Sequence, residues 1–141
     1  MGTVDSVFLD ASALIYLLEG EPQVREAVTA VLADLRSGTE DPALAISALS
    51  LLECRVRPLR QGDNKVLARY DEFFSDPGLI KVSLAERVLE RATQLRADHG
   101  LKTPDAIQAA SALALGEGVQ FVTGDKDFGR LMELTVHQIR V

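Results

Sequence analysis

The sequence predicts a three-layer α/β/α protein, in which helices cover both faces of a mainly parallel sheet of four to five strands. Short apolar runs alternate with helical patterns along the whole chain, which is the order that βαβ units produce. The runs are hydrophobic throughout, as in strands buried on both faces. Neither a repeat nor a linker interrupts the order, so residues 1–141 are expected to form a single domain.

The expected strands are apolar runs bounded by turn-forming residues; they are 7–9, 43–47, 79–82, 119–123 and, at an edge of the sheet, 135–141. The expected helices carry apolar side chains at three- and four-residue spacing or open with a start signal; they are 14–18, 22–35, one that begins near 49, 63–74, 83–99 and 103–114. Residues 38–42 are expected to be a loop, and residues 124–128 a turn or short helix.

Several residues mark the helix boundaries. Pro22 and Pro104 suit a first helical turn, where a missing backbone N–H costs nothing. Ser83 followed by Glu86 predicts a capping box. Pro58 is expected to bend or interrupt the helix that begins near residue 49.

Composition limits the classes of function. The net charge of −6 provides no general attraction for nucleic acid, although local basic patches remain open. No apolar run approaches the roughly 20 residues of a membrane-spanning helix, and a signal-peptide pattern is missing, so a cytoplasmic protein without a membrane partner is expected. Cys54 is the only cysteine and there are two histidines, so any metal would be held by oxygen.

Four acidic residues occupy positions that a parallel sheet brings to one edge. Asp10 directly follows the first strand, Asp125 follows the fourth, Glu53 lies just inside the helix after the second, and Asp105 lies in the first turn of a helix. Clustered carboxylates repel one another unless they are protonated or bind a cation. Oxygen ligands suit Mg²⁺ or Mn²⁺, which would activate water and stabilise charge during chemistry on a phosphate ester.

Each acid also has a simpler explanation. Asp10 and Asp125 are suitable helix N-caps, Asp105 would favour the helix dipole, and an isolated Glu53 would face solvent. The four become more specific together, because they occur in order with helices and strands between them.

The chain resembles the PIN-domain nucleases, and most closely the VapC-type toxins of toxin–antitoxin pairs, along essentially its whole length. The motifs that carry this resemblance are Leu9-Asp10-Ala11-Ser12, Ser50-Leu51-Leu52-Glu53, Thr103-Pro104-Asp105-Ala106 and Val122-Thr123-Gly124-Asp125-Lys126-Asp127-Phe128. The resemblance implies a Mg²⁺- or Mn²⁺-dependent endoribonuclease that forms a homodimer and is inhibited by a cognate antitoxin. It also implies that Asp10, Glu53, Asp105 and Asp125 bind the metal.

Other residues near these motifs have less certain roles. Asp127 is either an additional outer ligand or a residue that orders its loop. The hydroxyls of Ser12 and Thr123 suit the orientation of carboxylates or their waters. Gly124 departs from the family, which commonly has Asn at this position, so a side-chain hydrogen bond near Asp125 is lost or the backbone is looser.

Three arginines beside Glu53 are candidates for contacts with RNA phosphates. Arg55, Arg57 and Arg60 offer forked donor arrays on a chain without a general basic surface. The alternative is an ordinary solvated helix face.

Competing enzyme classes fit the motifs less well. A haloacid-dehalogenase-like phosphatase requires a second Asp two positions after the first, where this chain has Ser12. A phosphoacceptor receiver domain requires an acidic pair ahead of its acceptor strand. The alternative of another class is a non-catalytic RNA-binding or protein-interaction module on the PIN fold, and the presence of all four acids argues against it.

Overall fold

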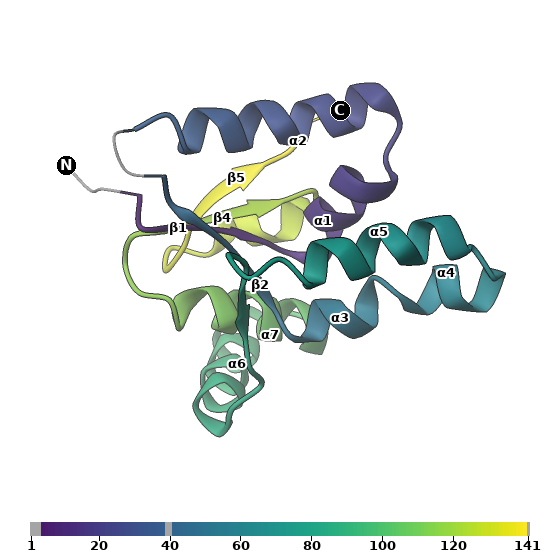
Figure 1. The fold of residues 1–141 in the computed structure, drawn as a ribbon. Coiled ribbons are helices and arrows are strands. Elements are labelled where there is room, and N and C mark those ends of the chain that lie inside the picture. Colours follow the sequence, from purple (N-terminus) through teal and green to yellow (C-terminus); the bar gives the residue numbers. More distant parts are fainter. Residues whose placement is uncertain (1–3, 39–40, 141) are drawn as a thin grey trace.

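In this computed structural model, which describes residues 4–38 and 41–140, five parallel strands form one sheet in the order β3-β2-β1-β4-β5 (Figure 1). The strands are β1 (Ser6–Leu9), β2 (Ala43–Ser47), β3 (Ile80–Val82), β4 (Val119–Thr123) and β5 (Thr135–Gln138). The predicted fold class is confirmed, and every pairing is parallel. The last strand lies at an edge as predicted but ends at Gln138; Val141 and residues 39–40 of the predicted loop lie outside the described residues.

The helices are α1 (Ala11–Glu19), α2 (Pro22–Leu35), α3 (Leu49–Glu53), α4 (Val56–Gln61), α5 (Asn64–Phe74), α6 (Glu86–His99), α7 (Thr103–Leu113) and the 3₁₀ helix η1 (Lys126–Arg130). Pro58 interrupts its helix as predicted, since α3 and α4 are separate. Proline has no N–H to bond to the carbonyl four residues earlier, which belongs to Cys54 at the break.

The predicted capping box at the start of α6 is wrong. Helix α6 begins at Glu86 itself, with Ala85 at the N-cap and no side-chain capping bond. Ser83 therefore lies outside the helix. The first helix is also longer than predicted, because α1 begins directly after Asp10 and extends to Glu19.

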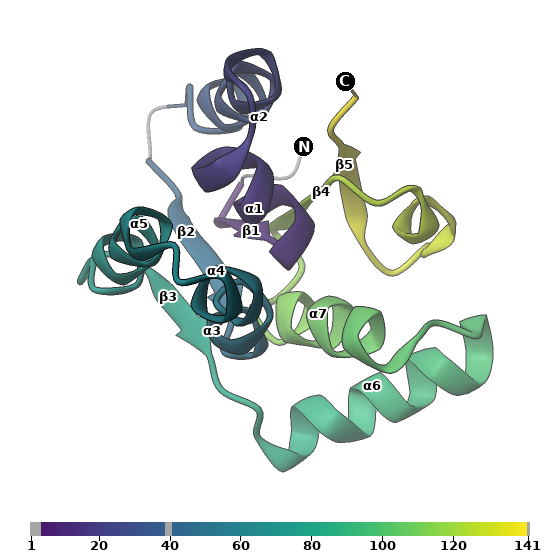
Figure 2. The ribbon, with the colours of Figure 1, turned by 90° about the vertical axis from the view of Figure 1, so that its right-hand side faces the viewer.

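Alternating side chains of the strands feed two hydrophobic cores, one on each face of the sheet. Val7 and Leu9 pack with α1, α2 and α5, whereas Phe8 packs with α6, α7 and η1. Figure 2 shows these two groups of helices on opposite sides of the strands. This alternation is expected for a sheet buried on both faces.

The connections reverse direction at the centre of the sheet. From β1 the chain builds outward through β2 to β3, and it then returns to place β4 on the other side of β1. In open α/β sheets, ligands bind beyond the carboxyl ends of the strands at such a switch point. Here that point lies beyond Leu9 and Thr123. No described helix is long and apolar enough to cross a membrane.

Candidate metal centre

Asp10 lies at the switch point and is almost fully buried, with 3% of its surface exposed. Its Oδ1 accepts hydrogen bonds from the Ser12 hydroxyl at 2.7 Å and the Ala13 backbone N–H at 2.9 Å. Its Oδ2 accepts from the Thr123 hydroxyl at 2.6 Å. The bond from Ala13 caps α1, so the capping role predicted for Asp10 coexists with its place in the site.

Burial shifts the protonation of this carboxyl. Desolvation raises the pKa of Asp10 to about 6, although the bonds from Thr123, Ala13 and Ser12 lower it, and the nearby charge of Asp125 adds to the rise. A buried carboxylate that accepts three hydrogen bonds but has no cationic partner would be stabilised by a bound cation.

The end of β4 is joined to the start of α1 by the two predicted hydroxyl residues. The Gly124 N–H donates to Ser12 Oγ at 2.9 Å, and the Asp125 N–H donates to Thr123 Oγ1 at 2.9 Å. The same hydroxyls hold Asp10. Ser12 and Thr123 therefore fix the backbone around Asp125 relative to Asp10.

Asp105, Asp125 and Asp127 form a carboxylate cluster, in which one oxygen from each residue lies within 4.8 Å of the others. Asp125 Oδ1 also accepts from the Asp127 N–H at 2.9 Å and so caps η1. The pKa of Asp105 is raised, first by burial and then by the charges of Asp125, Asp127 and Glu53. Asp10 and Glu53 lie outside the cluster but within its electrostatic range.

Phe128 packs between the segment that carries Asp125 and Asp127 and the hydrophobic core. It is fully buried, and its ring lies 4.7 Å from that of Phe121, which in turn stacks on Phe8 at 5.4 Å. Because Phe128 belongs to η1, the aromatic contact holds the short helix against the sheet. Asp125 and Asp127 are thereby attached to the hydrophobic core.

Glu53 is half-buried and has a partner that sequence reasoning missed. Gln108 Nε2 donates to Glu53 Oε1 at 2.9 Å and to Ser50 Oγ at 3.0 Å. Gln108 lies one turn after Asp105 on α7, and only 2% of its surface is exposed. A polar residue on the inward face of an alanine-rich helix was the available signal.

The ring of Tyr16 packs against Gly124. A Cβ atom at position 124 would lie 2.4 Å from Cε2 and 2.8 Å from Cζ of Tyr16. The ring of Tyr16 therefore fills the space of a side chain at this position. A side chain larger than glycine at position 124 therefore requires the ring of Tyr16 to shift, and the effect of Gly124 on the backbone near Asp125 stays a prediction.

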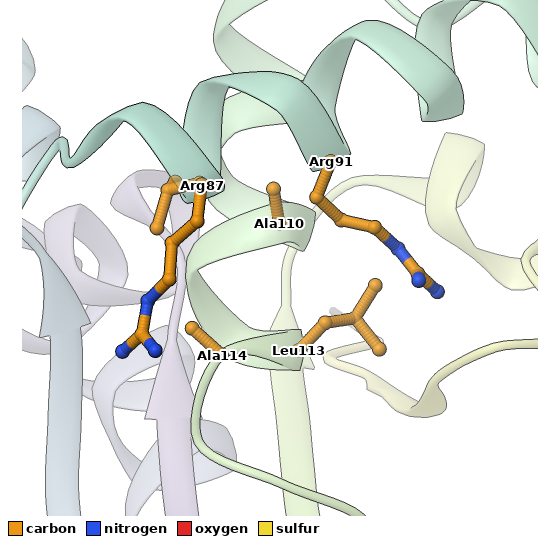
Figure 3. Close-up of a pocket in the computed structure, with 6 residues that line it drawn as sticks. Arg87, Arg91, Ala110, Leu113 and Ala114 are labelled. Atoms are coloured by element: carbon orange, nitrogen blue, oxygen red, sulfur yellow. The ribbon is translucent and has the colours of Figure 1, made fainter.

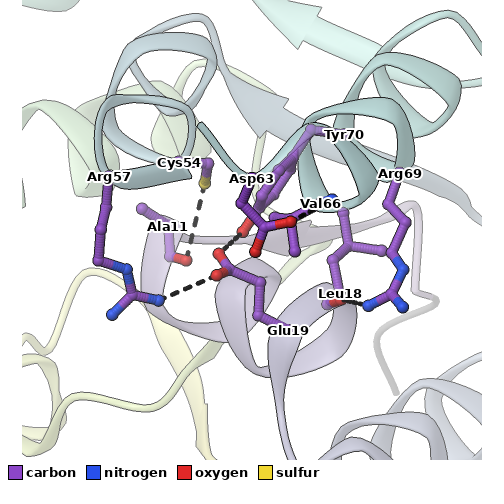
Figure 4. Close-up of polar contacts among 9 residues, drawn as sticks. All are labelled: Ala11, Leu18, Glu19, Cys54, Arg57, Asp63, Val66, Arg69 and Tyr70. Atoms are coloured by element: carbon purple, nitrogen blue, oxygen red, sulfur yellow. Dashed lines mark hydrogen bonds and ion pairs between the residues drawn. The ribbon is translucent and has the colours of Figure 1, made fainter. Parts of the chain in front are cut away.

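The three predicted substrate arginines differ in their surroundings. Arg57 forms an ion pair with Glu19 at 2.9 Å, and Glu19 also accepts a hydrogen bond from the Tyr70 hydroxyl (Figure 4). Arg55 donates to the Leu51 carbonyl at 2.7 Å. Arg60 is exposed and has no ion pair or side-chain hydrogen bond within the described part of the chain. Their contact with RNA stays a prediction.

Two surface features lie apart from the carboxylates. A hollow of about 220 Å³ between α6 and α7 is flanked by Arg87 and Arg91 (Figure 3). It includes Ala114, which follows the C-terminus of α7, whereas Asp105 is in the first turn, roughly 13 Å away along the helix axis. The second feature is an apolar groove at α3, α4 and α5 that exposes Leu52 and Leu59.

The donor set fits a hard divalent cation. The cluster and the two neighbouring acids supply oxygen atoms only, and the burial of Asp10 leaves a carboxyl whose ionised form lacks a cationic partner in the described structure. Mg²⁺ and Mn²⁺ prefer such ligands, whereas zinc usually takes nitrogen or sulfur. Asp105, Asp125 and Asp127 are placed to hold the ion, with Asp10 and Glu53 beside them.

These features define an α/β protein with a carboxylate site of the metal-binding type at the switch point of a parallel sheet. The chain belongs to the PIN-domain family, whose model matches residues 7–134. No curated protein matches the chain significantly in sequence.

Solved structures share the whole fold. The VapBC2 complex of Rickettsia felis, bound to a promoter DNA fragment, contains a chain that is 18% identical with a TM-score of 0.74, covering 95% of this chain and 99% of that chain. The Mycobacterium tuberculosis toxin VapC20, which cleaves the sarcin–ricin loop, is 18% identical with a TM-score of 0.70, covering 94% and 99%. A chain in a toxin–antitoxin complex from Klebsiella pneumoniae is 24% identical with a TM-score of 0.67, and the match covers 96% of this chain and 98% of that chain. The predicted resemblance to VapC-type toxins is confirmed as a likeness of fold.

Proposed function

We propose that the protein is a metal-dependent endoribonuclease and the toxin of a toxin–antitoxin pair. The observation that carries this proposal is the cluster of Asp105, Asp125 and Asp127 beside the buried Asp10, at the switch point of a PIN-domain sheet. Membership of the PIN-domain family and the likeness to VapC toxins support the same function.

In this proposal Asp10, Glu53, Asp105 and Asp125 hold Mg²⁺ or Mn²⁺, and Asp127 contributes a further oxygen. When bound, the cation would activate a water and offset negative charge that develops on the phosphate. The protein groups orient the site: Ser12 and Thr123 fix both oxygens of Asp10. Burial raises the pKa of Asp10 to about 6, so this carboxyl is mostly ionised at neutral pH and is protonated, and less able to bind a cation, in more acidic solution.

The proposed substrate is RNA, by analogy with the sarcin–ricin loop cleavage of the similar VapC20 toxin. Arg55, Arg57 and Arg60 remain the proposed phosphate contacts. Arg60 is the strongest of the three because its guanidinium has no competing acidic partner among the described residues, whereas Arg57 is bound to Glu19. An arginine at such a position would bind the phosphates of the RNA backbone, a contact that does not depend on the base sequence.

We also propose a cytoplasmic homodimer that is inhibited by an antitoxin protein. The similar chains from Rickettsia felis and Klebsiella pneumoniae occur in complexes with antitoxins. A short neighbouring reading frame whose product suppresses the toxicity of this protein would support the pairing. The mass of the purified protein in light scattering tests the dimer.

The central experiment measures cleavage of RNA by purified protein freed of any partner. We expect cleavage with Mg²⁺ or Mn²⁺, no cleavage in EDTA and none for Asp10→Asn. Asp98→Asn, which changes an exposed carboxylate on α6, is the matched control and should cleave normally. Cleavage that persists in EDTA and in Asp10→Asn would overturn the metal-dependent function. Metal binding without cleavage would favour a non-catalytic module on the PIN fold.

A further inference from the structure

Gln108 is an unusual residue for its position. The buried face of α7 consists mainly of alanines, which allow the helix to approach α6 and the sheet closely. A buried amide in such a face loses its hydration and must regain hydrogen bonds within the protein. The contacts that Gln108 makes therefore indicate what the residue does.

The amide nitrogen of Gln108 connects α7 to α3, which lie side by side in Figure 2. Its Nε2 donates to Ser50 Oγ at 3.0 Å and to Glu53 Oε1 at 2.9 Å. Only an N–H can face the carboxylate oxygen favourably, so the orientation of the amide is determined by Glu53. Gln108 Oε1 is buried and has no hydrogen-bond partner among the described residues.

Glu53 is an acid whose side chain such a partner would help to fix. It is the last residue of a five-residue helix, and a glutamate side chain has considerable rotamer freedom to lose. Its charge also repels Asp105, whose pKa it helps to raise. Asp10 and Asp125 are each held by backbone or hydroxyl groups, whereas the one side chain that bonds to Glu53 in the described structure is Gln108.

We propose that Gln108 is a positioning residue, which fixes one oxygen of Glu53 and leaves the other free to bind a divalent cation. A neutral amide suits this task because it orients the carboxylate without supplying a positive charge that would compete with the ion. The spacing contributes as well: Asp105 and Gln108 are three residues apart on α7, so a single helix carries one carboxylate and positions another. The inference rests on the proposed metal-dependent function.

Titration calorimetry of the metal-free protein with Mn²⁺ tests this role without any RNA. Gln108→Met keeps the approximate size and removes the donor, and we expect it to weaken Mn²⁺ binding about 10-fold, the effect typical of residues that orient metal ligands. Ser111→Ala is the matched control: it removes the 3.0 Å bond from Ser111 to Ser47 in the same helix interface and touches none of the acids. Its Mn²⁺ affinity should equal that of the wild type.

A double-mutant cycle separates positioning from general packing. If Gln108 acts through Glu53, then Gln108→Met should have no further effect on Mn²⁺ affinity in a Glu53→Gln background. Thermal unfolding in EDTA should stay within a few degrees of the wild type, because the substitution also removes the buried Oε1 that has no partner. Should Gln108→Met fold poorly, Gln108→Ala suits the alanine-rich helix and gives the same comparison.

Wild-type Mn²⁺ affinity in both Gln108 variants, or an equal loss with and without Glu53, would overturn the positioning role. These outcomes are distinct from a failure of the proposed function. If the wild type binds Mn²⁺ and loses affinity in Gln108→Met but cleaves no RNA, the nuclease proposal fails and the positioning role stands.

Discussion

Replacing Asp10 by asparagine should abolish activity and yet make the metal-free fold more stable relative to the wild type as the pH rises. Burial raises the pKa of Asp10 from 3.8 to about 6, which means that the folded state holds the ionised carboxylate poorly. Each tenfold change in proton affinity corresponds to about 1.4 kcal/mol. The ionised form therefore costs the fold roughly 3 kcal/mol at pH 8 when no cation is bound.

The sign of the pH dependence follows from this shift. A carboxyl with a raised pKa binds more protons in the folded state than in the unfolded state between pH 3.8 and about 6. The contribution of Asp10 to wild-type stability in EDTA therefore falls as the pH rises through this window and is level above it. The substituted asparagine would carry no charge at any pH, so the stability of Asp10→Asn relative to the wild type should rise by about 2 kcal/mol between pH 4.5 and pH 8. A loss that does not depend on pH is added to this difference, because one end of the amide donates where Asp10 accepts bonds from Ser12, Ala13 and Thr123.

Thermal unfolding in EDTA at the two pH values measures this difference. The unfolding temperature of the variant relative to the wild type should rise between them by the equivalent of this change, since 1 kcal/mol corresponds to roughly 3 °C for a chain of this size. Excess Mg²⁺ should narrow the gap by stabilising the wild type more than the variant, which lacks one of the carboxylates. Asp98→Asn should not change stability. If the stability of Asp10→Asn relative to the wild type does not rise between pH 4.5 and pH 8, the argument that the carboxylate is buried at a cost is refuted.

Three further substitutions test contacts around the site. Gly124→Asn should lower the unfolding free energy by about 1–3 kcal/mol, because its Cβ would lie 2.4 Å from the Tyr16 ring; urea unfolding should show recovery when Tyr16→Ala is added, and no recovery would contradict this packing. Tyr70→Phe should cost about 1.5–3 kcal/mol in the same assay through the lost bond to Glu19, and an unchanged midpoint would show that the bond adds nothing. Arg60→Ala should weaken RNA binding by inactive Asp10→Asn protein and reduce its salt slope by about 1; equal affinity at every salt concentration would exclude a phosphate contact.

The sequence was sufficient to predict the sheet and the edge at which the acids gather. Buried parallel strands are short apolar runs, and each run except the last was placed within a residue or two of its observed bounds. Asp10 and Asp125 could be predicted together because each lies within two residues of the end of a strand, and the carboxyl ends of neighbouring parallel strands lie close together. The capping-box prediction was wrong although Ser83 and Glu86 have the required spacing. Helix α6 begins only at Glu86, so the N-cap residue is Ala85 and not Ser83.

Partners set by tertiary packing could not be predicted. Gln108 and Glu53 are 55 positions apart, so the local sequence can mark Gln108 as a polar residue on an alanine-rich helix face but cannot identify Glu53 as its partner. The ion pair between Arg57 and Glu19 spans 38 positions and likewise depends on how α1 and α4 pack. The packing of the Tyr16 ring against Gly124 joins positions more than 100 residues apart and is likewise set by how α1 packs beside β4.

The central position of β1 has a consequence for the order of synthesis. Asp10 and its partner Thr123 are 113 positions apart, and the carboxylate cluster takes two members from the segment that follows β4. A growing chain that has produced only β1, β2 and β3 therefore contains Asp10 and Glu53 but not the three residues of the carboxylate cluster. Since proteins begin to fold during translation, the proposed nuclease activity would be absent from the growing chain until β4 has been made and has paired with β1.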